Sequence, residues 1–291
     1  MTPALTLRER SETEASRLPP LLAHAEQLAG TVLLGDHGRR RAGLGDDFWQ
    51  YRPAQHGDSR RLIDHRRSAR GDQQFVRERE WQIAQSVMLW VDQGASMRFA
   101  SDKSVPQKQE RARLLALAIA ILLVRGGERV GLTGTRLPPR RGNAQIIRLA
   151  EAWTEDADAD YEPPEHRAMV PYARAVFVSD FLGDLSEVET ALTKAADRGV
   201  RGVLLQVLDP SEELFPFQGR TIFESVGGTV RHETLKAGEL RGRYLERLAE
   251  RKAKLQELCH VTGWQLGLHH TNDSAQSALL WLYRALDGGR R

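Results

Sequence analysis

Apolar residues in the later two-thirds of this chain form short continuous runs that end at polar residues. The first run is VMLWV at residues 87–91, and Asp92 follows it directly. Runs of this length are typical of strands that are buried on both faces of a parallel sheet. We expect residues 87–91 to be the central strand of one sheet. Its other strands are expected at residues 129–133, 173–179, 202–208 and 264–269.

Helical patterns separate these runs. They occupy residues 108–125, 144–153, 185–198, 240–259 and 274–286. A helix between two parallel strands makes a βαβ unit with a right-handed crossover, so the sheet is expected to be mostly parallel. The sequence therefore predicts an α/β fold over residues 83–291, with a doubly wound, Rossmann-like sheet. The Gly227-Gly228 pair favours a hairpin inserted at residues 220–234.

The first 82 residues follow a different pattern. Residues 1–18 are polar and are expected to form a flexible N-terminus. A helix is expected to begin near Pro19 and Pro20, because proline suits a first helical turn. From Thr31 onward, glycines and prolines separate short segments that alternate like strands. We group residues 19–82 as one N-terminal part, a helix followed by an arginine-rich, mainly β arm.

Composition limits where the protein acts. The chain has 291 residues, of which 41% are hydrophobic, which suffices for one large core. The longest apolar run, residues 114–124, is shorter than the roughly 20 residues that cross a bilayer. The N-terminus has no apolar signal core, and the single cysteine, Cys259, excludes an internal disulfide. We therefore expect a cytoplasmic protein without a membrane span.

Arginine is concentrated between residues 39 and 79, a stretch that contains no lysine. Arg60, Arg61 and Arg66 belong to this group, and acidic residues alternate with its members. The favoured interpretation is a network of internal ion pairs, in which arginine binds carboxylates through two hydrogen bonds. The alternative is a nucleic-acid surface, which would bind with a steep salt dependence. We do not expect nucleic acid to be the partner.

Acidic residues stand directly after three of the predicted strands. These residues are Asp92, Asp180 and Asp209, and Thr133 ends a fourth strand. Ligands of open parallel sheets collect at the carboxyl ends of the strands. Asp92, Ser96 and Asp180 are therefore expected to converge at one edge. Carboxylate and hydroxyl oxygens are the ligands that a hard cation such as Mg²⁺ prefers.

Two families resemble this arrangement. The motif VDQGASM, followed by a helix, RVGL and VFVSDF, resembles the von Willebrand factor A fold. The metal-ion-dependent adhesion site of that fold uses Asp-x-Ser-x-Ser, a later Thr and a later Asp. The preceding stretch GRRRAGLGDDFWQYRPAQHGDSRRLIDHRRSARGDQQFVRERE is similar to the signature of the bacterial family called domain of unknown function 58. The resemblance covers residues 18–287.

The resemblance implies a degenerate metal site. Asp92 matches the first acid of the adhesion-site pattern, Ser96 its second serine and Asp180 its late acid. Gly94 stands where the first serine belongs, and the loop at residues 142–143 offers no threonine. With two oxygen ligands missing, we expect no cofactor, or Mg²⁺ that binds only weakly.

The resemblance also implies a function. The chain is similar to accessory proteins that work beside a MoxR-type AAA+ ATPase to remodel or mature a client complex. The resemblance implies that such proteins are adaptors rather than enzymes. The sequence agrees, since it shows neither a nucleophile paired with a base nor a phosphate-binding glycine loop.

The leading hypothesis is a protein-interaction module. Its docking face is expected to hold Asp92, Gly94, Ser96 and Asp180, with Arg60, Arg61 and Arg66 of the arm nearby. The alternative is a metal-dependent hydrolase that uses Asp92 and Asp180 to bind its cation. A hydrolase of this kind would lose its activity in a chelator.

Overall fold

The computed structural model describes residues 20–32, 39–43, 47–55, 63–69, 71, 73–83, 85–135, 137–154, 157, 159–228 and 231–287. The expected flexible N-terminus, residues 1–18, lies outside these residues. The chain divides into two compact units, of which the smaller is Asp36–Gln85.

The larger unit is built on a parallel sheet. Its described strands pair in the order β10-β7-β6-β4-β5. Their bounds are β4 (Ser86–Val91), β5 (Arg129–Leu132), β6 (Arg174–Ser179), β7 (Arg201–Leu208) and β10 (Gln265–His270). The α/β class and the parallel sheet are therefore confirmed. The prediction that residues 87–91 form the central strand was wrong. Among the described strands β6 is in the middle, and β4 has only β5 beyond it.

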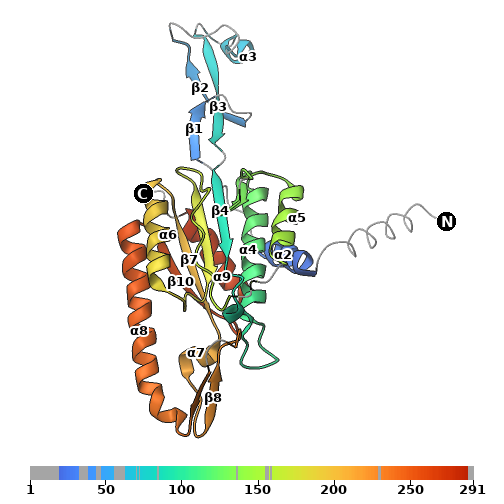
Figure 1. Ribbon diagram of the computed structural model, residues 1–291. Helices are drawn as coiled ribbons and strands as arrows, with labels where there is room; N and C mark the ends of the chain where they lie inside the picture. The colour runs from blue at the N-terminus through green and yellow to red at the C-terminus, as the bar shows by residue number, and fades with distance from the viewer. Residues whose placement is uncertain are drawn as a thin grey trace, which may run out of the picture. The chain divides into compact units, whose positions relative to one another are not determined.

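Helices cover both faces of the sheet, as Figure 1 shows. On one face α4 (Lys108–Arg125), α5 (Asn143–Ala152) and α9 (Ala275–Asp287) pack into one apolar cluster. On the other face α6 (Leu185–Asp197) and α8 (Ala237–Thr262) pack into a second. The bounds of α4 match the predicted helix at both ends. Its residues Leu115–Leu123 are all buried, which agrees with the apolar character of every side of this helix.

The N-terminal helix belongs to the larger unit. Helix α2 (Pro20–Gly30) begins at Pro20, close to the predicted start. Its buried residues Leu22, Ala25 and Ala29 lie in the same apolar cluster as α4. The sequence grouped this helix with the arm, whereas the structure places it in the larger unit.

The smaller unit is the mainly β arm. Strands β1 (Arg39–Gly43), β2 (Asp47–Pro53) and β3 (Phe75–Ile83) pair antiparallel in the order β1-β3-β2. A short helix, α3 (His65–Ser68), was not predicted, and the Asp64 carboxylate caps it by accepting the N–H of Arg67. The Arg67 guanidinium lies 5.5 Å from the ring centre of Tyr51. This contact is a cation–π interaction.

Three short elements lie beyond the carboxyl ends of the strands. The hairpin of β8 (Thr221–Glu224) and β9 (Arg231–Thr234) agrees with the predicted insertion. Helix α7 (Pro210–Leu214) and the 3₁₀ turn η2 (Ala95–Arg98) were not predicted. Figure 1 shows α7 and β8 at the lower end of the sheet. Among the described residues, no helix combines the length and the apolar character that crossing a bilayer requires.

Candidate functional site

Asp92 links the ends of two strands. It follows β4, and its main-chain N–H donates to the carbonyl of Val178 on β6. Its Oδ1 accepts the N–H of Gly94 at 2.8 Å, and its Oδ2 accepts the hydroxyl of Ser179 at 2.6 Å. The side chain is buried. Both oxygens of the first predicted acid are therefore bound by uncharged donors.

Gly94 is held beneath a neighbouring loop. The N–H of Ser96 donates to the carbonyl of Asp160 at 2.9 Å, so the main chain of this loop lies directly on the turn after β4. A Cβ atom at Gly94 would lie 2.8 Å from the oxygen of Asp160 and 3.1 Å from the nitrogen of Glu162. Main-chain atoms give way at a high cost, so glycine is required here. Close packing of the main chain thus explains why position 94 holds glycine and not the serine of the resembled pattern.

Asp180 pairs with a lysine that sequence reasoning missed. The Nζ atom of Lys108 lies 2.8 Å from Oδ2 of Asp180 and 2.6 Å from Oε1 of Glu212. Lys108 and Asp180 are only 1% and 0% exposed. Burial alone would lower the pKa of Lys108, but the charges of Asp180 and Glu212 raise it above its ordinary value. The ammonium group therefore stays protonated at neutral pH.

Asp209 and Glu212 form the cap of helix α7. Oδ1 of Asp209 accepts the N–H of Ser211, and Oε2 of Glu212 accepts the N–H of Asp209, which is a capping box. The second oxygen of Asp209 accepts the N–H of Ser101 at 2.9 Å. Although burial would raise the pKa of Asp209, these hydrogen bonds lower it. Asp209 is therefore a structural cap.

The two predicted acids differ in their electrostatics. Burial, and next the carboxylate of Asp180, raise the pKa of Asp92 to about 7. Hydrogen bonds from Ser179 and Gly94 oppose this shift, but neither donor carries a charge. Asp180 has the Lys108 ammonium group beside it instead. At neutral pH the protonated form of Asp92 is thus substantially populated.

These contacts do not fit an Mg²⁺ site. Mg²⁺ requires a nearly octahedral shell of oxygen ligands. The Lys108 ammonium group already compensates the charge of Asp180, and main-chain atoms exclude a serine at Gly94. Ser96 keeps a buried Oγ that has no hydrogen-bond partner within the described residues. Across the described part of the chain, no three His, Cys, Asp or Glu side chains form a metal-binding group.

With this geometry in view, the comparisons with known proteins assign the family. The family described as "Protein of unknown function DUF58" matches residues 50–254. This chain belongs to the DUF58 family. The match includes β4, the turn after it, Lys108, Asp180 and Glu212, so the whole candidate site of this DUF58 chain lies within it.

Two solved structures are similar to the DUF58 chain. One is an aerotolerance-related membrane protein from Bacteroides fragilis, with 15% identity and a TM-score of 0.42. The other is the conserved hypothetical protein BatB from Bacteroides thetaiotaomicron, with 16% identity and a TM-score of 0.39. Each comparison covers 70% of this chain and 100% of the other chain. A search of curated proteins gives no match.

Sequence reasoning found only part of the site of this DUF58 chain. Asp92, Gly94, Ser96 and Asp180 lie together at the ends of β4 and β6. Arg66 is exposed on α3 in the smaller unit, and Arg60 and Arg61 lie outside the described residues.

The sequence carried signals for the missed residues. Lys108 opens α4, where the positive end of the helix dipole disfavours a cation, so a lysine there calls for an acidic partner. The spacing of Asp209 and Glu212 is that of a capping box. Neither signal identifies Lys108 and Glu212 as each other's partners, because 104 residues separate them along the chain.

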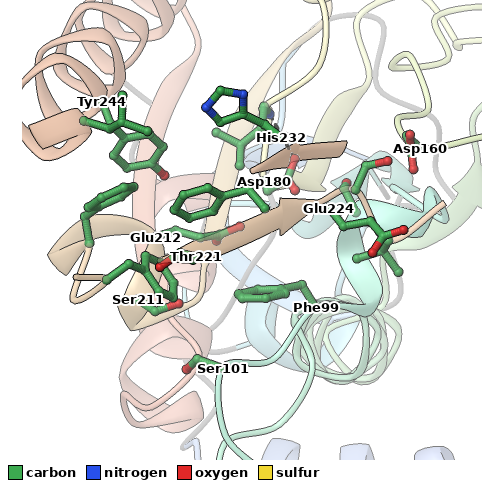
Figure 2. Close-up of a pocket in the computed structure, with 18 of the residues that line it drawn as sticks. Phe99, Ser101, Asp160, Asp180, Ser211, Glu212, Thr221, Glu224, His232 and Tyr244 are labelled. Atoms are coloured by element: carbon green, nitrogen blue, oxygen red, sulfur yellow. Dashed lines mark hydrogen bonds between the residues drawn. The ribbon is translucent and has the colours of Figure 1, made fainter. Parts of the chain in front are cut away.

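A large pocket adjoins the buried ion pairs of the DUF58 chain. Its volume is about 820 Å³, and it lies between the β8–β9 hairpin, α7 and the first half of α8. Figure 2 shows Asp180 and Glu212 among the lining residues, with Tyr244, Thr221 and Phe99 around them. We call the pocket together with the Lys108–Asp180–Glu212 cluster the carboxyl-end face.

Proposed function

We propose that this chain is a non-enzymatic adaptor that binds partner proteins at its carboxyl-end face. The observation that carries the proposal is a large apolar pocket beside acids that are already paired within the chain. Pockets of this kind, with a few buried polar groups at their base, are typical of binding sites.

The state of Lys108 supports a binding role over a catalytic one. A lysine acts as a base or nucleophile when its pKa is lowered towards neutral. Here Asp180 and Glu212 raise the pKa of Lys108, so its charge is fixed. Lys108 therefore gives the face a positive charge that persists at neutral pH.

For the partner we propose a MoxR-type AAA+ ATPase, with which the chain would remodel or mature a client complex in the cytoplasm. The support is the likeness of the sequence motifs to adaptors of such ATPases, together with the membership in the DUF58 family. The geometry adds a pocket that is large enough for a protein partner, since a volume of about 820 Å³ accommodates one or more large side chains.

A metal-dependent hydrolase at Asp92 and Asp180 is the competing proposal, and the geometry disfavours it. A cation that bound Asp180 would have to compete with Lys108, whose Nζ lies 2.8 Å from the carboxylate. Two positive charges at this distance from one carboxylate repel each other strongly in a buried site.

The test measures binding of the purified chain to the MoxR-type ATPase of the same genome by biolayer interferometry. Ile222→Asp places a charge on an exposed residue of the pocket lining, and we expect at least tenfold weaker binding, as for a hot-spot residue. Leu235→Asp is the matched control, because Leu235 is also exposed but does not line the pocket. Equal binding by both variants would overturn the proposed docking face.

A further inference from the structure

The pocket of the carboxyl-end face has an aromatic wall. The ring of Phe215 lies 5.3 Å from that of Phe217, 5.6 Å from that of Phe223 and 4.9 Å from that of Tyr244. These rings come from the segment after α7, from β8 and from α8. All four line the pocket. Ring clusters of this kind receive an aromatic side chain in stacked or edge-to-face contacts.

The base of the pocket has unused hydrogen-bond donors. An ammonium group has three N–H bonds, and Lys108 uses two of them on Asp180 and Glu212. Ser211 is only 6% exposed, and in the part of the chain that the structure describes its Oγ has no partner. The hydroxyl of Ser96, which also lines the pocket, lacks a described partner as well. A ligand with an acceptor atom would satisfy groups that are otherwise left unpaired.

The charge at the base selects the kind of acceptor. Two carboxylates, Asp180 and Glu212, flank the single ammonium group of Lys108. At this base a third carboxylate from a ligand would meet a net negative charge at close range, which is unfavourable in a buried site, although Arg243 and Arg247 also line the pocket. A neutral acceptor meets no such repulsion. The carbonyl of a peptide bond or of a side-chain amide is such an acceptor.

We propose that this pocket binds a large apolar side chain, preferably aromatic, from an uncharged segment of a partner protein. A carbonyl of that segment accepts hydrogen bonds from Lys108 and Ser211. This inference rests on the proposed docking function and adds the chemistry of the bound segment.

The hairpin favours an extended conformation of that segment. In the described chain, β8 and β9 form a sheet of only two strands. The lining residues Thr221–Glu224 are the whole of β8. A partner segment that follows this strand would present alternate side chains to the pocket, as in recognition by strand addition.

The experiment uses three small probes and the full chain labelled with ¹⁵N. The probes are N-acetylphenylalanine amide, N-acetylphenylalanine with its free carboxylate, and N-acetylalanine amide. Binding is followed by the NMR shifts of pocket residues such as Phe223 and Tyr244. We expect the phenylalanine amide to bind about tenfold more tightly than either other probe, which corresponds to about 1.4 kcal/mol.

Two variants test the residues. Phe223→Ala removes one ring of the wall, and we expect about tenfold weaker binding of the phenylalanine amide. Ser211→Ala removes a hydroxyl that has no described partner in the free chain, so the fold should be unaffected. If Ser211 donates to the ligand, its loss weakens binding about fivefold. Leu235→Ala is the control for both, because Leu235 is exposed and outside the pocket.

The outcomes separate this inference from the proposed function. Equal binding of the amide and the carboxylate would overturn the neutral acceptor, and equal binding of the alanine amide would overturn the aromatic preference. An absence of shifts up to the solubility limit would overturn the whole inference. The docking function would still stand in that case if Ile222→Asp weakened binding to the ATPase while Leu235→Asp did not.

Discussion

The ends of β4 and β6 carry acids at equivalent positions, and their surroundings are opposite. Asp92 after β4 lies in a turn on which the main chain of Asp160 packs, and its donors among the described residues, Gly94 and Ser179, are uncharged. Asp180 after β6 pairs with Lys108 and lines the large pocket. Asp92 and Gly94 after β4 are thus enclosed by main-chain contacts, whereas Asp180 after β6 adjoins an open pocket.

This difference shows that an acid at a strand end does not by itself make a ligand site. The sequence motifs predicted that both residues would serve as acids of one metal site. The neighbours decide the outcome, since a buried carboxylate is stabilised either by a charge or by taking up a proton. Here the positive charge of Lys108 lies beside Asp180, whereas Asp92 has no cation beside it among its contacts with the described residues and has a raised pKa.

The largest expected effect comes from breaking the ion pairs at the β6 end. Lys108→Met leaves the buried carboxylates of Asp180 and Glu212 without their cation, so we expect a loss of about 3–5 kcal/mol in the free energy of unfolding. Urea denaturation measures this loss. Lys254→Met is the control, because Lys254 pairs with Glu257 on the surface and should cost less than about 1 kcal/mol. Similar losses in both variants would contradict the account.

The next effect is the pH dependence at the β4 end. The folded state binds the proton of Asp92 more tightly than the unfolded chain, because the folded pKa is raised to about 7. Asp92 therefore contributes stability at low pH that is lost as the pH rises through 7. Asp92→Asn keeps an acceptor for Gly94 and cannot ionise beside Asp180 and Glu162.

We expect Asp92→Asn to be more stable than the original chain by about 2–4 kcal/mol at pH 8. At pH 4 the two chains should have nearly equal stability. Thermal unfolding at a series of pH values measures the difference. An original chain that was the more stable of the two at pH 8 would show that Asp92 is stabilised in its charged form.

A smaller effect is expected from restoring the missing serine. Gly94→Ser forces a Cβ atom against the main chain of Asp160 and Glu162, and we expect a loss of about 1–3 kcal/mol. Gly238→Ser is the matched control, because a Cβ atom at Gly238 meets nothing within 4 Å. If Gly94→Ser were as stable as its control, the conclusion that main-chain contacts enclose Gly94 would be wrong.

The sequence predicted the fold well because the fold follows from local patterns. The apolar runs and helical periodicities give the strands and helices of the larger unit, and the bounds of α4 agree at both ends. The order of the strands is not a local property, so β4 was wrongly placed at the centre. Helix α2 was grouped with the arm for the same reason, since its packing against α4 is a tertiary contact.

The candidate site could be predicted only in part. The position of Asp92 and Asp180 at strand ends follows from topology. Their partners do not, because Lys108 meets Asp180 across 72 residues of chain. The pocket could not be predicted either, since its walls come from β8, α7 and α8, which are separate along the sequence.

The most direct test of the central claim is a calorimetric titration of Mg²⁺ into the purified full chain. The claim is that the Lys108 ammonium group, and not a metal ion, compensates the charge of Asp180. It predicts no saturable heat of binding at millimolar Mg²⁺, in the original chain and in Asp92→Asn alike. Saturable binding of one ion that Asp92→Asn abolishes would contradict the claim.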